Sequence, residues 1–104
     1  MGQTANRKMG ARLNMTIRCI LEEKAVSDVV DAFERDCPQM SEAWRGLGWL
    51  LVRTPEIGFV IDDKRPGLRI HRMNTLGNLP DICVMYTFDE SIVNICAIRV
   101  IRKD

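Results

Sequence analysis

Residues 82–102 have the sequence ICVMYTFDESIVNICAIRVIR. It consists of two long runs rich in β-branched and apolar residues, separated only by Asp89-Glu90-Ser91. Runs of this composition form strands, and so short a polar connection favours antiparallel pairing across a tight turn. The stretch therefore predicts a β-hairpin that forms the centre of a sheet.

One strand and two helices are predicted upstream of this hairpin. Residues 15–21 alternate between apolar and polar side chains, which is typical of a strand. From Ala25 the apolar residues recur at helical spacing as far as Pro38, which ends the first helix. A second helix is expected from an N-cap at Ser41 to the residues just before Pro55.

A further strand is predicted at residues 68–73, where the alternation returns. One face of this strand would carry Leu68, Ile70 and Arg72, and the other Arg69, His71 and Met73. The order of elements is therefore strand, helix, helix and three antiparallel strands. It predicts an α+β fold in which a helical hairpin packs on one face of an antiparallel sheet.

The length of 104 residues fits one domain. Residues 1–14 lack hydrophobic periodicity and carry only basic charges, so we expect a flexible basic arm followed by a single domain at 15–104. No apolar run approaches the roughly 20 residues that span a bilayer. The four cysteines are widely separated and predict neither a metal cluster nor a disulfide scaffold. We expect a cytoplasmic protein that needs no metal or other cofactor and binds no membrane.

The charge is unevenly distributed along the chain, although the net charge is only +1. Residues 22–63 carry ten acidic and four basic groups, whereas residues 64–104 carry four acidic and seven basic groups. If the first segment is helical and the second forms the sheet, one surface would be acidic and another would attract anions.

The order of elements and two short motifs resemble the RelE/ParE superfamily of bacterial toxins, from type II toxin–antitoxin systems of the plasmid-stabilisation type. The end of the second helix, Leu51-Val-Arg-Thr-Pro55 followed by Gly58, is similar to a conserved step of that family. Residues 84–93 resemble its penultimate strand, acidic turn and last strand. The likeness covers residues 16–101 and implies a β-α-α-β-β-β fold.

In the nuclease branch the resemblance implies metal-independent cleavage of messenger RNA on the ribosome, by an mRNA interferase. Attack by a 2′-hydroxyl needs a base, cations around the phosphate and an acid for the leaving oxygen. The candidate catalytic residues are Arg69, His71, Arg72, Tyr86 and Arg99. We expect Arg69, His71 and Arg99 to gather on the uncovered face of the sheet.

Additional RNA contacts are expected from Lys64, Arg65 and Arg102. Four of the catalytic candidates also have a structural alternative. For Arg69 and His71 it is a solvated side chain on a strand. Tyr86 is in phase with core residues, which suits a buried, hydrogen-bonded hydroxyl. Arg99 is in phase with apolar residues of the last strand, so it needs either an ion-pair partner or a wet groove.

Two departures from the nuclease pattern leave other functions open. Cys83 lies where many active members have an arginine, and the chain ends at Asp104, where several members carry a further catalytic residue in a tail. The alternatives are a gyrase-inhibitor type that binds a protein target without catalysis, and an inactive module that binds a partner. A convergent Arg/His/Tyr cluster on the open face would favour the nuclease, and an apolar face would favour binding.

The partners implied by the resemblance are an antitoxin protein together with either the ribosome and mRNA or DNA gyrase. An antitoxin would lay a helix or an extended segment across the helical hairpin or the open sheet.

Overall fold

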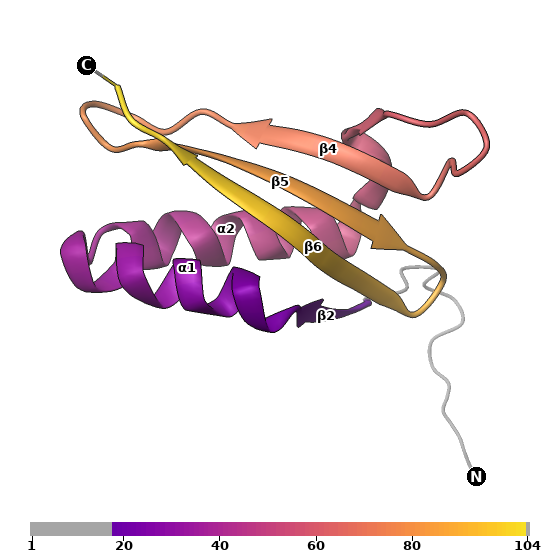
Figure 1. Cartoon of the computed structure of the whole chain (residues 1–104), viewed down its shortest axis with the longest axis horizontal. Helices are drawn as coiled ribbons and strands as arrows, with labels where there is room; N and C mark the ends of the chain where they lie inside the picture. Colours follow the sequence, from indigo (N-terminus) through magenta and orange to yellow (C-terminus); the bar gives the residue numbers. More distant parts are fainter. Residues whose placement is uncertain (1–17, 104) are drawn as a thin grey trace, which may run out of the picture.

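The computed structural model describes residues 18–103, and their elements follow the predicted order with one additional short strand (Figure 1). The predicted arm at 1–14 and the first residues of the predicted strand at 15–21 lie outside the described part. The elements are β2 (Cys19–Glu22), α1 (Lys24–Asp36), α2 (Met40–Arg53), the 3-10 helix η2 (Pro55–Ile57), β3 (Phe59–Val60), β4 (Leu68–Met73), β5 (Asp81–Phe88) and β6 (Ile92–Ile101).

The two helices form where the apolar spacing predicts them. In α1 the buried residues Val26, Val30 and Phe33 lie one helical turn apart and form a single stripe. The second helix begins at Met40 and not after a cap at Ser41, so that part of the prediction is wrong. The hydroxyl of Ser41 lies inside the helix and donates a hydrogen bond to the Glu34 carboxylate at 3.0 Å.

The sheet has the order β2-β6-β5-β4-β3. Strands β3 to β6 pair antiparallel, but β2 pairs with β6 in parallel. The sheet is therefore mixed, whereas the sequence predicted an antiparallel one. The α+β class and the predicted β-α-α-β-β-β order are confirmed, with β3 as an extra edge strand of two residues.

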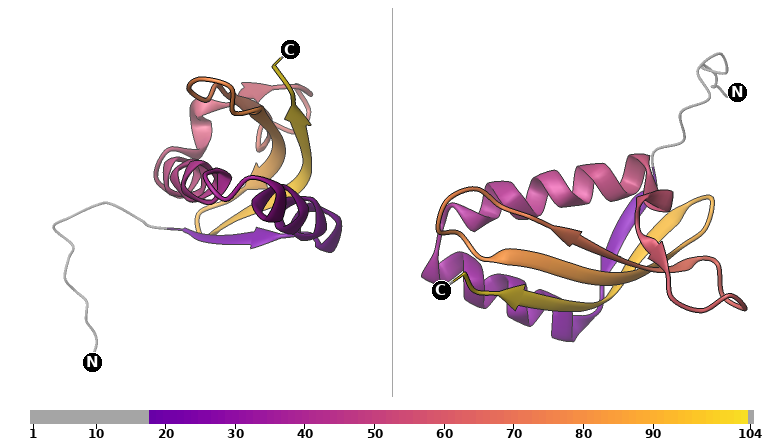
Figure 2. Two further views of the ribbon diagram at one scale, coloured as in Figure 1. Left: turned by 90° about the vertical axis from the view of Figure 1, so that its left-hand side faces the viewer. Right: turned by 90° about the horizontal axis from the view of Figure 1, so that it is seen from above.

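The buried core joins the helices to one face of the sheet. Its sheet members include Ile82, Val84 and Tyr86 of β5 and Val93 and Ile95 of β6. Figure 2 shows the helices together on one side of the curved sheet and the opposite side of β4, β5 and β6 uncovered. The described residues contain no helix that is both long and apolar enough to span a bilayer.

An irregularity in β6 changes which of its side chains face the core. Met85 pairs with Ala97, but the next residue of β5, Tyr86, pairs with Ile95, so Cys96 is an extra residue in β6. A bulge of this kind shifts the alternation by one residue. Before the bulge, Ile95 and the residues in phase with it point towards the helices. After the bulge, Ala97 and the residues in phase with it point to the opposite face of the sheet.

Candidate functional site

The strand register divides the predicted catalytic residues between the two faces of the sheet. Directly paired residues on neighbouring strands point to the same face. Arg69 pairs with Tyr86 and His71 pairs with the core residue Val84, so these three candidates lie on the face that meets the helices.

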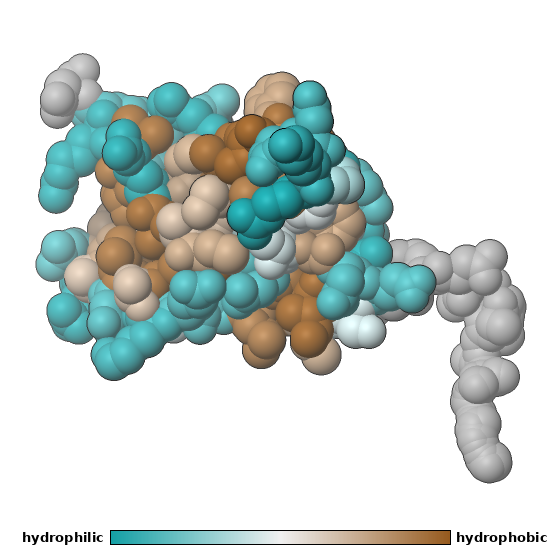
Figure 3. Space-filling model, turned by 45° about the vertical axis from the view of Figure 1, so that its right-hand side comes forward, coloured by the Kyte–Doolittle hydropathy of each residue, from teal (hydrophilic) through white to brown (hydrophobic). Residues whose placement is uncertain are grey.

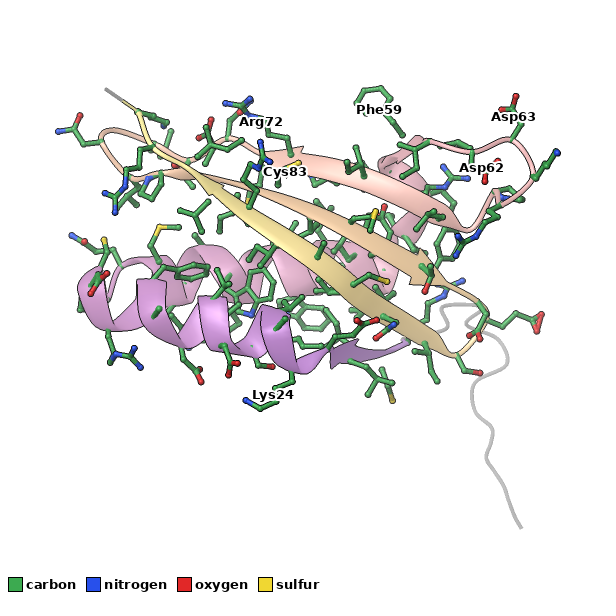
Figure 4. All side chains as sticks on the ribbon, in the orientation of Figure 1. Lys24, Phe59, Asp62, Asp63, Arg72 and Cys83 are labelled. Atoms are coloured by element: carbon green, nitrogen blue, oxygen red, sulfur yellow. The ribbon has the colours of Figure 1, made fainter. Side chains whose placement is uncertain are left out.

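Arg72 and Arg99 lie on the open face. Both pair with Cys83, which gives a row Arg72–Cys83–Arg99 across β4, β5 and β6. Figure 4 shows Arg72 and Cys83 close together on adjacent strands. The expected gathering of Arg69, His71 and Arg99 on one face is therefore wrong, because β4 turns its odd-numbered residues towards the helices.

Tyr86 has its hydroxyl fully engaged inside the protein. The side chain is 0% exposed. Its hydroxyl donates to the carbonyl oxygen of Pro55 at 2.5 Å and accepts from the backbone N–H of Gly58 at 3.0 Å. Burial raises the pKa of Tyr86 above its ordinary value. This geometry supports the structural alternative for Tyr86, a buried and hydrogen-bonded hydroxyl.

Arg69 binds the backbone of the segment that precedes β4. Its guanidinium donates to the carbonyl oxygens of Glu56 at 2.8 Å, Gly58 at 3.2 Å and Pro66 at 3.1 Å. The same group lies 5.5 Å from the centroid of the Phe88 ring. Arg69 therefore holds residues 56–66 against β4, and three of its donors are already used.

His71 is half-buried on the helix side of β4. Desolvation by this burial lowers the pKa of His71 below 6.5, so the neutral imidazole is favoured at neutral pH. It is adjacent in sequence to Arg72 but points to the other face, and so cannot share a phosphate with the two open-face arginines.

Arg72 forms an ion pair with a buried carboxylate. Its guanidinium lies 2.9 Å from Asp81, which is only 4% exposed. Asp81 also accepts from the backbone N–H of Thr75 at 2.9 Å and lies 3.4 Å from the ammonium group of Lys103. The Thr75 N–H and the Arg72 guanidinium are the two largest causes that lower the pKa of Asp81 to about 2. This cluster ties β4, the 74–80 connection and the C-terminal residues together.

A groove of about 400 Å³ lies along the open face of the sheet. Its floor is mostly apolar, and Cys83 and Arg99 add a thiol and a cation. The apolar lining side chains that the register places on this face are Ile70, Met85, Ala97 and Ile101. Such a surface suits contact with an apolar segment of another molecule. Arg99 could form an ion pair with an acidic group on that segment.

The predicted RNA-binding residues do not line this groove. Lys64 and Arg65 are exposed in the connection before Leu68, at the end of the sheet where Leu68 pairs with Thr87. Arg102 follows Ile101, which pairs with Asp81 at the opposite end. The three cations are thus divided between the two ends of the sheet.

A second apolar groove, of about 300 Å³, lies on the helix side between α2 and β2. Trp44 and Trp49 line it together with Ile20. The indole N–H of Trp44 donates to Glu22 at 3.2 Å, and the Arg53 guanidinium lies 5.6 Å from the Trp49 ring centroid. Figure 3 shows that exposed apolar areas form separate patches, bordered by hydrophilic residues, on the face it views.

The sequence did not predict the role of Asp81 or the close contact between Gly58 and Tyr86. Asp81 precedes an apolar strand in a turn-rich stretch, and a lone acid at that position gives no signal of its two cationic neighbours. For Gly58 a signal existed, because a glycine next to an apolar run often marks a close approach of backbone. A Cβ at Gly58 would lie 2.5 Å from the Tyr86 hydroxyl oxygen.

Comparison with known proteins gave no matching family model, and no curated protein and no solved structure matches the chain.

Proposed function

We propose that this chain is a RelE/ParE-like toxin component of a type II toxin–antitoxin pair that acts by binding a partner protein through the open face of its sheet. The order of its elements supports the RelE/ParE likeness. The apolar groove along the open face supports binding over catalysis and is the observation that carries the proposal.

The separation of the candidate catalytic groups also favours binding. Acid–base cleavage of RNA requires a base, a phosphate-binding cation and an acid within hydrogen-bond reach of one substrate. His71 and Tyr86 lie on the helix side, and the Tyr86 hydroxyl has two protein partners. Within residues 18–103, the cations that the register places on the groove side are Arg72 and Arg99, and the single histidine, His71, lies on the other face.

The partner surface that fits this groove is apolar with an acidic group at its edge. Its apolar part would cover the row formed by Ile70, Met85 and Ala97. The acidic group would meet Arg99, and complementary charge of this kind sets orientation and speeds association more than it adds affinity.

The test is induced expression in a bacterial host, with translation and DNA replication followed separately. We expect replication arrest or another block that leaves messenger RNA intact. Ala97→Arg, which places a long charged side chain in the groove, should abolish the effect. Ala25→Arg makes the same change at an exposed position of α1 and should retain it.

Two results would overturn the proposal. One is normal growth on expression of the wild-type chain with no partner retained on it. The other is equal toxicity of Ala97→Arg and wild type when both are present at the same level of folded protein.

A second candidate function is the ribosome-dependent mRNA endonuclease. One observation favours it: Arg72 and Arg99 flank Cys83 on the open face, where a phosphate could lie between two cations. In that case expression would stop translation with cleavage of messages, and Arg72→Ala and Arg99→Ala would each reduce cleavage. Intact messages in arrested cells would exclude it.

A further inference from the structure

The edge of the sheet at β3 exposes a run of apolar side chains. Phe59 is 74% exposed, and Val60 and Ile61 are 41% and 47% exposed. Ile57, just before them, is 46% exposed. Figure 4 shows Phe59 projecting away from the body of the molecule. Exposed apolar residues are ordinary when scattered, but a contiguous run on a sheet edge marks an interaction surface.

The backbone of β3 is available for pairing on one side. Strand β3 is the last in the sheet order, and among residues 18–103 it pairs with β4 alone, through Phe59–Ile70 and Val60–Arg69. Polar backbone groups on its outer side can therefore accept another strand. Most sheet edges are protected by a charge, a proline or a bulge, but residues 59–61 carry none of these.

The segment that leads into this edge is held rigidly. The Tyr86 hydroxyl accepts the N–H of Gly58, and the Arg69 guanidinium binds the carbonyl oxygens of Glu56 and Gly58. A strand fixed in this way loses little conformational entropy when it pairs. The two residues thus present the edge in a conformation ready for pairing.

We propose that β3 is the pairing edge of a symmetric homodimer, in which a second copy of this chain adds its own β3 antiparallel. A two-fold axis near Val60 would pack the apolar run of one copy against that of the other, as an isologous interface requires. The two sheets would then form one continuous sheet.

The charges that flank the apolar run suit a second copy. Glu56 precedes it. Asp62 and Asp63 follow it directly, and Lys64 and Arg65 come after these two acids in an exposed turn. Antiparallel pairing brings Glu56 of each copy towards Lys64 and Arg65 of the other. Within residues 18–103, the ion pairs found join other groups, so these three charges are free for such contacts.

The interface would be small. A standard stable interface buries about 800 Å² on each partner, and a short edge with a few apolar side chains offers less. We therefore expect a dimer that dissociates on dilution, and the proposal is independent of the function assigned to the open face.

Sedimentation velocity of the full chain over a range of concentrations tests the association. We expect the wild type to shift from monomer to dimer as concentration rises, and Phe59→Lys to remain monomeric. Leu76→Lys is the matched control, because Leu76 is 88% exposed in the 74–80 connection, and it should dimerise like the wild type. Circular dichroism of each variant confirms folding.

Amide hydrogen exchange then tests whether the edge itself pairs. The amides of residues 59–61 should exchange more slowly as concentration rises. A wild type that is monomeric throughout, or a Phe59→Lys variant that dimerises as well as Leu76→Lys, would overturn the proposal. Exchange at residues 59–61 that does not change with concentration would also overturn it, because the pairing with β4 inside one chain would then account for all of their protection.

Discussion

The phenolic oxygen of Tyr86 lies 3.0 Å from the backbone nitrogen of Gly58 and accepts its hydrogen. The contact joins the central strand of the sheet to the segment between α2 and β3. Tyr86 and Gly58 are 28 residues apart in sequence. It leaves no room for a side chain at residue 58, since a Cβ there would lie 2.5 Å from that oxygen and 2.8 Å from the carbonyl oxygen of Ile70. Gly58 is therefore required by close approach and not by an unusual backbone angle, because its φ is −77°.

Gly58→Ala should destabilise the protein. The added methyl group must push away buried backbone and the Tyr86 hydroxyl, and overpacking of this kind costs about 1–3 kcal/mol. Urea denaturation measures the free energy of unfolding. Gly46→Ala is the control, because a Cβ at this position of α2 meets nothing within 4 Å. It should stabilise by about 0.5–1 kcal/mol through helix propensity. If both substitutions stabilise the protein, the contact between Tyr86 and Gly58 does not restrict position 58 to glycine.

Tyr86→Phe should destabilise the protein without disturbing the fold. The ring remains in the core, but the carbonyl of Pro55 and the N–H of Gly58 lose their partner, and unsatisfied buried groups cost about 1–3 kcal/mol. Amide exchange of Gly58 should accelerate more than that of Val84, which lies on the same strand as Tyr86. Equal acceleration at both amides would show a general loss of stability and no specific role for the hydroxyl.

The sequence predicts which elements form, but not how they face one another. The β5–β6 hairpin and both helices follow from composition and periodicity, because these are local signals. The alternation in residues 68–73 separates Arg69 and His71 correctly from Ile70. It does not say which set meets the helices, since each set contains an apolar residue and a cation. That choice depends on partners distant in sequence, such as Glu56, whose carbonyl oxygen accepts from Arg69.

The site residues were predicted less well for the same reason. Arg99 is separated from Ile95 by the bulge at Cys96. The bulge reverses which face of the sheet the following side chains of β6 point to. A bulge of one residue leaves no clear trace in an apolar strand, so the predicted phase of Arg99 with Ile95 is wrong, although Arg99 lies on the uncovered face as expected. The parallel pairing of β2 with β6 was equally hidden, because strand direction within a sheet is set by the path of the intervening helices.

Acid should weaken the cluster around Asp81. Its pKa is lowered to about 2 in the folded protein, from an ordinary value of 3.8. A carboxylate whose pKa is depressed on folding contributes stability above the unfolded pKa, and loses that contribution as pH falls towards the folded one. We therefore expect stability to fall between about pH 4 and pH 2.

Urea midpoints measured across this range test the effect. Asp81→Asn should be less stable than wild type at pH 6 and should show a weaker dependence on pH between pH 4 and pH 2. Asp31→Asn, which changes an exposed acid on α1, should keep the wild-type slope. A wild-type slope in Asp81→Asn would mean that other carboxylates account for the acid sensitivity.

His71 should titrate below pH 6.5, because burial lowers its pKa. Between the folded pKa and 6.5, the unfolded chain binds more protons than the folded one. The free energy of unfolding should therefore decrease as pH falls below 6.5, and the contribution of His71 should be fully present above that pH. His71 is the single histidine of the chain, so its ring resonance in a proton NMR titration needs no assignment. The urea midpoint of His71→Gln should not show the wild-type decrease between pH 6.5 and the folded pKa. An imidazole that titrates at or above 6.5 would place His71 in open solvent or beside a carboxylate, and either would contradict its position on the helix side of β4.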